Sequence, residues 1–424
     1  DDAGVATVGG NSGPMSAKNL HVSTVGDELK LATGGRGKVV GVSFKDRAAI
    51  LMAGHAADAV IWFDGTTSNW VTSTYYAKTL PRWVQEVNAE KVPASTIGKS
   101  WTPLLSDSAY RETRRAPFVK GAAGSPIFSH KISNGGDFTA SSYGQEYVFR
   151  TAERAVSEER LGQDDVPDVL CINLATNDYV GHAYGPDSPE VMDMAVRTDR
   201  LFSEFFEYLH NHVNGGLAST VIVVTADHGI APIPEESNGT YRLGHVVRGR
   251  ASALAAAVNK ALAAKYGDGK YVQYCYPPHI YIDHSLLETR HADLAEAERV
   301  AAAAARSVSG IYEAFAGEDI LTGQVPDWPW MHEVANGYNR ALSGDVMAFE
   351  VPGSIFAGGA GTTHGTPWAY DTHVPLMLFG PGVHAGTYSQ RVSQCDIAPT
   401  LCRLLRIEQP SGSVGRLLVG ALGG

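Results

Sequence analysis

Aspartate and histidine side chains recur in this chain at spacings that suit the binding of a metal ion. Asp178 and His182 lie in the segment LATNDYVGHAYGPD, directly after an apolar run at 166–176. If residues 178–182 form a helical turn, the two side chains share one face and can hold one cation. Taken alone, the pair is equally consistent with an Asx turn followed by a surface histidine.

A second aspartate–histidine pair follows another apolar run. Asp227, His228 and Gly229 come directly after the segment VIVVTA. Neighbouring side chains of a strand point to opposite faces, so both can reach one metal ion only where the chain leaves the strand, and Gly229 would permit such a turn. Ligands of open α/β sheets bind beyond the carboxyl ends of parallel strands. The alternative is an Asp227 that caps the next turn beside a packed His228.

A late histidine, His364, lies in the glycine-rich segment AGGAGTTHGTPW. Glycines let the backbone approach a site closely, and they stand here at positions 358, 359, 361 and 365. His373 competes as a ligand, but it begins an apolar run, so we expect it to orient the structure or to support a ligand. A mobile glycine loop without a site is the competing interpretation.

Two cationic side chains stand close together in the segment SFKDRAAI. Lys45 and Arg47 are two residues apart on a predicted strand, so both should point to one face while Asp46 points away. Two cations on one side of a cleft suit a doubly charged phosphoryl group, and arginine can bind two of its oxygens. An edge strand whose charges discourage aggregation would show the same pattern.

The elements that must position these residues alternate between strands and helices. Apolar runs predict strands at 38–44, 59–63, 166–176 and 219–226. Apolar residues at helical spacing after Pro189 predict a helix between the last two of these strands. Strand, helix and strand in this order are typical of a parallel sheet in an α/β protein.

Two stretches depart from this alternation. Residues 65–165 are rich in aromatic residues, serine and proline, and we expect an irregular insertion or cap over the site. Residues 231–345 contain two alanine-rich helical segments around the strand-like YCYPPHIYID, and we expect a helical insertion. A chain of 424 residues is then one large α/β domain, 1–424, that carries both insertions.

Charge and composition exclude several classes of partner. The net charge of −11 argues against nucleic acid or an anionic membrane as the main partner. We find no apolar run long enough for a membrane span.

No CxxC pair occurs, and Cys395 and Cys402 would stand roughly 10 Å apart on one helix, too far to form a disulfide.

Together these motifs resemble the metal ligands of the alkaline phosphatase superfamily, and the closing DIAPTLCRLL is similar to its C-terminal segment. The segment NLHVSTVGDELKLATGGRGKVVGVSFKDRAAILMAGH, followed by AVIWFD, resembles the phosphate-irrepressible branch of bacterial alkaline phosphatases. The resemblance covers about residues 16–415. It implies an alkaline-phosphatase-like three-layer α/β/α sandwich with a mostly parallel sheet and cap or insertion segments.

The resemblance also implies two zinc ions. The matching ligands are Asp178, His182 and His364 for one ion, and Asp227 and His228 for the second. The second ion would take a further protein ligand from an N-terminal segment of the family. Manganese or cobalt would also suit aspartate and histidine ligands.

The same resemblance implies how the phosphoryl group is handled. Lys45 and Arg47 match the pair that binds its oxygens, and the family's nucleophile is a threonine in the N-terminal segment. No such motif occurs in this chain, and GVATVGGNSGP is only superficially similar. Neither Thr7 nor Ser12 is therefore assigned the role, and we expect the nucleophile upstream of residue 1.

The implied function is metal-dependent hydrolysis of phosphate monoesters through a covalent phospho-threonine intermediate. A phosphodiesterase or nucleotide pyrophosphatase of the same superfamily is the nearest alternative, and a non-catalytic metal-binding fragment is another. A diester carries one charge and has less use for both Lys45 and Arg47. We expect small phosphorylated substrates, a monomer, and a periplasmic or secreted location.

Overall fold

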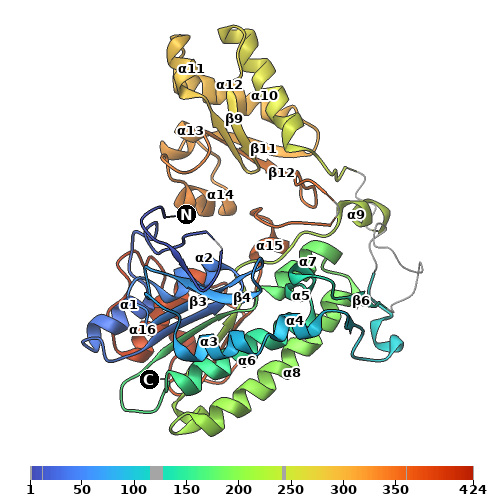
Figure 1. The fold of residues 1–424 in the computed structure, drawn as a ribbon. Helices are drawn as coiled ribbons and strands as arrows, with labels where there is room; N and C mark the ends of the chain where they lie inside the picture. The colour runs from blue at the N-terminus through green and yellow to red at the C-terminus, as the bar shows by residue number, and fades with distance from the viewer. Residues whose placement is uncertain (1, 12, 115–127, 241–244, 360, 424) are drawn as a thin grey trace.

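The computed structural model shows an α/β body that carries a smaller lobe (Figure 1). It describes residues 2–11, 13–114, 128–240, 245–359 and 361–423. Ser12 lies outside the described residues. The lobe contains the helices labelled α10 to α12, whereas the two chain ends lie in the body.

The body is built on a five-stranded sheet in the order β1-β4-β3-β2-β7. In chain order its strands are β1 Thr7–Val8, β2 Val39–Ser43, β3 Ala59–Asp64, β4 Asn69–Ser73 and β7 Val169–Asn173. Strand β2 lies between β3 and β7 and runs parallel to both. The carboxyl ends of these three strands therefore meet at one edge of the sheet.

Helices cover both faces of this sheet because side chains alternate along its strands. Val40 and Val42 face a core completed by α6 Ser142–Glu158 and α8 Pro189–His212. On the opposite face, Val39 packs with residues of α1 Val25–Ala32 and α2 Asp46–Ala53. The predicted three-layer α/β/α arrangement is confirmed.

The segment that carries Lys45 and Arg47 is a helix and not the predicted strand. β2 ends at Ser43, and Lys45 is the N-cap residue of α2. Asp46 stands in the first turn of α2, where its negative charge suits the positive end of the helix dipole. The edge-strand alternative is also wrong, because β2 lies between β3 and β7.

The strands that precede the two aspartate–histidine pairs share no ladder in the described part of the chain. β7 pairs with β2, whereas β8 Ile222–Thr225 pairs antiparallel with β13 Leu376–Phe379. Each apolar run was expected to form a buried strand of one parallel sheet. Instead, Leu170 and Val223 are only half-buried, because each strand is paired along one edge among the described residues.

The lobe is built on an antiparallel sheet in the order β11-β12-β10-β9. The strands are β9 Val272–Tyr276, β10 His279–Ile282, β11 Ile311–Ala316 and β12 Val346–Glu350. The alanine-rich helices α10 Ala251–Tyr266 and α12 Leu294–Arg306 share one apolar core with it. The insertion expected to be helical is thus a mixed α/β lobe.

Residues 65–165 are more regular than the expected irregular insertion. They include β4, α3 Arg82–Ala89, α4 Val92–Thr96 and α6. Trp83 and Val84 of α3 are buried in the same core as Phe149 of α6. Much of this stretch therefore belongs to the layer that covers the sheet.

The remaining helices of more than four residues are α5 Gly135–Thr139, α7 Thr176–Tyr184, α9 Pro234–Thr240, α11 His284–Thr289, α13 Gly317–Leu321, α14 Pro329–Gly337 and α16 Ile397–Leu405. A shorter helix, α15 Ala369–Thr372, lies where the lobe meets the body (Figure 1). All four cysteines are free. Within the described ranges, no helix is long and apolar enough to cross a membrane.

Candidate metal centre

Helix α7 presents Asp178 and His182 on one face, one turn apart. The Nε2 atom of His182 lies 3.2 Å from Oδ1 of Asp178, and its Nδ1 atom lies 2.8 Å from the carbonyl oxygen of Thr362. A proton on Nδ1 would be donated to that carbonyl, which leaves the Nε2 lone pair for a metal ion. The contact with Thr362 thus selects the ring tautomer that a ligand needs.

The carboxyl of Asp178 is held in its ionised form. Burial favours the neutral acid, but the contacts with His182 and Lys45 outweigh it and hold the pKa of Asp178 well below its usual range. The same contact with Asp178 raises the pKa of His182. An ionised carboxylate is the form that binds a cation.

The segment after β8 brings His228 to the same carboxylate. Its Nε2 atom lies 3.9 Å from Oδ1 of Asp178 and 3.6 Å from Oδ2 of Asp227. Gly229 does not have the left-handed backbone that a special turn would require. It is needed for close packing instead, because a Cβ atom there would come within 2.0 Å of the carbonyl oxygen of Tyr370.

His364 arrives on the loop that crosses between α7 and the segment after β8. Thr362 donates its backbone N–H to the carbonyl of His182, at 3.0 Å, and its hydroxyl to the carbonyl of Ala231, at 2.7 Å. Gly361 permits this approach, since its φ is +95° and a Cβ atom would lie 2.1 Å from the carbonyl oxygen of His182. Hydrogen bonds therefore hold the loop to α7 on one side and to the segment after β8 on the other.

The imidazole of His364 stacks on that of His228, with 3.3 Å between the ring centroids. Its Nε2 atom lies 3.5 Å from Oδ1 of Asp178. Burial, helped by the nearby charge of His228, lowers the pKa of His364 to about 4. The ring is therefore neutral at pH 7 and its nitrogen is free to bind a metal ion.

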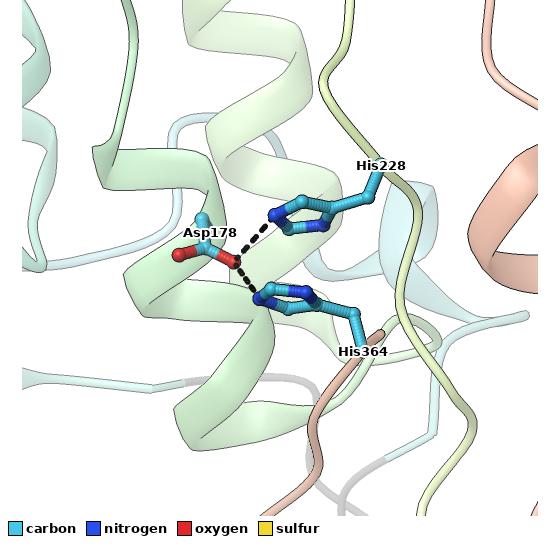
Figure 2. A group of neighbouring side chains, drawn as sticks. All are labelled: Asp178, His228 and His364. Atoms are coloured by element: carbon cyan, nitrogen blue, oxygen red, sulfur yellow. Dashed lines mark ion pairs between the residues drawn. The ribbon is translucent and has the colours of Figure 1, made fainter. Parts of the chain in front are cut away.

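Figure 2 shows the resulting cluster, in which both imidazoles point at one oxygen of Asp178. Ligand atoms of Asp178, His228 and His364 all lie within 4.8 Å of one another. Oδ1 of Asp178 is buried and has no hydrogen-bond partner among the described residues. A buried carboxylate oxygen surrounded by imidazole nitrogens fits a divalent cation such as zinc.

The other predicted ligands lie around this cluster. His182 contacts the same Oδ1 atom from within α7, as described above. Asp227 stands at the edge, and 62% of its side chain is exposed. His373 is exposed at the end of α15 and does not belong to the cluster that the described residues form.

Lys45 reaches the cluster from the N-terminus of α2. Its ammonium group forms an ion pair with Oδ2 of Asp178 and lies 5.1 Å from the centre of the Tyr179 ring. Arg47 is exposed, and its charge opposes the rise in the pKa of Tyr179 that burial causes. The positive end of α2 adds to the field of both side chains.

Several residues that shape the site were missed by the sequence analysis. Thr362 orients His182, and Arg248 donates to the carbonyls of Gly359, at 3.2 Å, and Gly361, at 2.8 Å. Asp371 binds the loop that follows His364. Single polar residues in loops carry no spacing signal, so only the folded structure reveals these contacts.

The lobe forms one wall of a cavity beside His364. Its lining includes Tyr276, at the end of β9, and Phe356, in the segment that follows β12. Glu350 also lines the cavity, and burial raises the pKa of its carboxyl to about 7. The cluster therefore faces the junction between lobe and body.

Comparisons with known proteins show what the whole chain resembles. A family model described as type I phosphodiesterase/nucleotide pyrophosphatase matches residues 30–374. Alkaline phosphatase PafA of Elizabethkingia meningoseptica is 33% identical over 431 residues, which cover 99% of this chain and 78% of that protein. The crystal structure of wild-type PafA matches with a TM-score of 0.90 and covers 100% of this chain and 82% of that one.

Two further relatives cover nearly the whole chain. Alkaline phosphatase PhoV of Synechococcus elongatus is 31% identical over 433 residues, which cover 100% of this chain and 77% of that protein. A Myroides odoratus protein named calcium-transporting ATPase is 34% identical over 444 residues, which cover 98% of this chain and 78% of that protein.

Proposed function

Because the chain belongs to the type I phosphodiesterase/nucleotide pyrophosphatase family, within the alkaline phosphatase superfamily, we propose that it hydrolyses phosphate monoesters at the cluster around Asp178. It is a hydrolase of the alkaline phosphatase type. The observation that carries the monoester assignment is the contact of Lys45 with the metal-binding carboxylate, with Arg47 on the same helix.

The cluster of Asp178, His228 and His364 supports a divalent cation. We propose one zinc ion at Asp178, His182 and His364 and a second at Asp227 and His228. His228, which lies in the cluster with Asp178 and His364, would then bind the second ion beside the first. Bound cations would neutralise the phosphoryl charge and stabilise the leaving oxygen. Neighbouring parts of the chain prepare the ligand side chains for this role. Thr362 fixes the orientation of the His182 ring, and burial keeps His364 neutral.

Lys45 and Arg47 would bind the phosphoryl oxygens. The ammonium of Lys45 is mostly buried next to Asp178, so its charge is little screened by solvent. The guanidinium of Arg47 can bind two oxygens at once. Such fixed positive charges stabilise the charge that builds up in the transition state.

A phosphodiesterase is the second candidate, because the matching family model is named for that activity. A monoester offers two negative charges to Lys45 and Arg47, whereas a diester offers one. Small phosphorylated compounds are therefore the proposed substrates. A periplasmic or secreted location is part of the same proposal.

The Lys45→Ala/Arg47→Ala double variant tests the substrate class. Each lost charge-assisted hydrogen bond costs about 1.5–3 kcal/mol, which is roughly tenfold to a hundredfold in rate. We expect kcat/KM to fall more for an aryl phosphate than for a bis-aryl phosphate. The two losses need not add, because both residues contact one group.

A matched control is the Lys30→Ala/Arg36→Ala variant, which removes the same charge elsewhere. Lys30 pairs with Asp58, which precedes β3 at the amino ends of the parallel strands. This control should leave both rates close to those of the wild-type protein. An equal loss for both substrates in the Lys45/Arg47 variant would favour the phosphodiesterase.

A further inference from the structure

Two of the histidines in the cluster come from loops far apart in the sequence, and their rings must be held in stacking contact. His228 follows β8, and His364 lies on the loop that follows the lobe. The segment at α15 contacts both of these loops. A residue of α15 could therefore position the two ligands together.

Asp371 of α15 touches each loop with a different part of its structure. Its backbone carbonyl accepts the N–H of Gly229 at 2.7 Å, next to His228. Its carboxylate Oδ2 atom accepts the N–H of Thr366 at 2.8 Å and the hydroxyl of Thr366 at 2.6 Å, two residues after His364. A backbone bond from Gly365 also reaches this side chain.

Asp371 is itself firmly placed. The residue is only 3% exposed, and its backbone N–H donates to the carbonyl of Trp368 at 2.9 Å. The indole of Trp368 donates to the carbonyl of Glu350 at 2.9 Å, and the hydroxyl of Tyr370 accepts the N–H of Gly353 at 3.1 Å. These contacts anchor α15 to the end of β12 and to the segment that follows it.

The second carboxylate oxygen supports a role beyond packing. Oδ1 of Asp371 is buried and has no hydrogen-bond partner among the described residues. Burial raises the pKa of the Asp371 carboxyl, and the nearby charge of His228 opposes that rise. A buried carboxylate oxygen without a partner is costly unless its negative charge stabilises a nearby positive one.

We propose that Asp371 is a positioning residue for the metal centre, which holds the loops of His228 and His364 in register and adds negative charge near His228. The inference rests on the proposed function, because it presumes that these histidines bind a cation. Residues that support metal ligands in this way commonly contribute about 10–100-fold to metal affinity.

Three variants test the proposal by zinc affinity, measured by competition with a chelating dye, and by thermal unfolding with and without zinc. Asp371→Ala should weaken zinc binding about 10–100-fold and reduce the rise in Tm that zinc produces. Asp371→Asn keeps an acceptor for Thr366 but loses the charge, so its affinity should lie between those of Ala and wild type. Thr366→Val, which removes one of the two donors, should weaken binding less than Asp371→Ala.

Asp27→Ala is the matched control. Asp27 is also a buried carboxylate that accepts backbone N–H groups, from Thr24 at 3.0 Å and from His55 at 2.7 Å. It contacts the C-terminal end of α2, about 12 Å of helix away from Lys45. This variant should lower Tm equally with and without zinc and should leave zinc affinity unchanged.

The outcomes distinguish a failure of the proposed function from a failure of the proposed role of Asp371. If the wild-type protein binds no zinc, the proposed function fails. If it binds zinc and Asp371→Ala binds it equally well, only the role of Asp371 is overturned. If Asp371→Asn binds zinc as weakly as Asp371→Ala does, the hydrogen bonds of Asp371 do not support the metal centre. If Asp27→Ala loses as much zinc affinity as Asp371→Ala, the effect reflects a general loss of stability and not the position of Asp371.

Discussion

At the scale of single residues, one carboxylate organises the site. Asp178 is contacted by His182, His228 and His364 through one oxygen and by Lys45 through the other. Helix α7 places Asp178 where three separate segments can converge on it. This arrangement explains why the ligands recur as short, widely separated motifs in the sequence.

The choice of the late histidine is a prediction at this scale. His364→Ala should reduce zinc affinity by more than the roughly 10–100-fold that a supporting residue contributes, because it removes a nitrogen of the cluster itself. His373→Ala is the natural control, since that side chain is exposed and its loss should change unfolding by less than about 0.5 kcal/mol. The assignment is overturned if zinc binding survives the first change and is lost in the second.

At the scale of elements, loops position the ligands and their glycines have distinct tasks. Gly361 has a left-handed backbone and packs against the carbonyl of His182, whereas Gly358, in the same loop, faces open space. Composition alone treats the two glycines as equivalent. The contacts of the folded loop separate them.

Exchanging each of these glycines for alanine tests that difference. Gly361→Ala should destabilise the protein by about 1–3 kcal/mol and should also weaken zinc binding, because the loop must move away from α7. Gly358→Ala should be neutral or stabilise by up to about 1 kcal/mol, through the unfolded state. Urea unfolding with and without zinc measures both effects, and equal results for the two variants would contradict this account of the loop.

Local sequence signals predicted several elements of the body correctly. The strands β2 and β3 and the helix α8 lie where their apolar patterns placed them. The segment after β2 was misjudged because two cations at a spacing of two suit a strand, whereas the chain turns directly into α2. The partners of β7 and β8 depend on long-range pairing, which apolar runs do not encode.

The candidate ligands could be predicted from short sequence motifs. The contacts that support these ligands could not. Aspartate and histidine at short spacing indicate a metal-binding site from the sequence alone. The bonds from Thr362 to His182 and from Thr366 to Asp371 join positions that only the fold brings together. A lone threonine in a glycine-rich loop gives no local indication of such a role.

At the scale of the whole molecule, the lobe and the body meet at the site. The lobe was expected to be helical because its alanine-rich helices dominate the pattern. The segment YCYPPHIYID, which was expected to be strand-like, forms the strands β9 and β10, and these join β11 and β12 in a four-stranded sheet that was not predicted. The end of β9 lines the cavity beside His364. The lobe therefore lines a cavity that adjoins the candidate metal centre.

The central claim is that hydrolysis of phosphate monoesters depends on metal held by Asp178. Its most direct test follows hydrolysis of an aryl phosphate before chelation, after chelation and after zinc is added back, in wild type and in Asp178→Ala. Chelation should slow the wild-type reaction by roughly 100-fold or more, since metal ions contribute several kcal/mol to such reactions. Zinc should restore the wild type and not Asp178→Ala. A rate that chelation leaves unchanged, or an Asp178→Ala variant that recovers with zinc as the wild type does, would contradict the account.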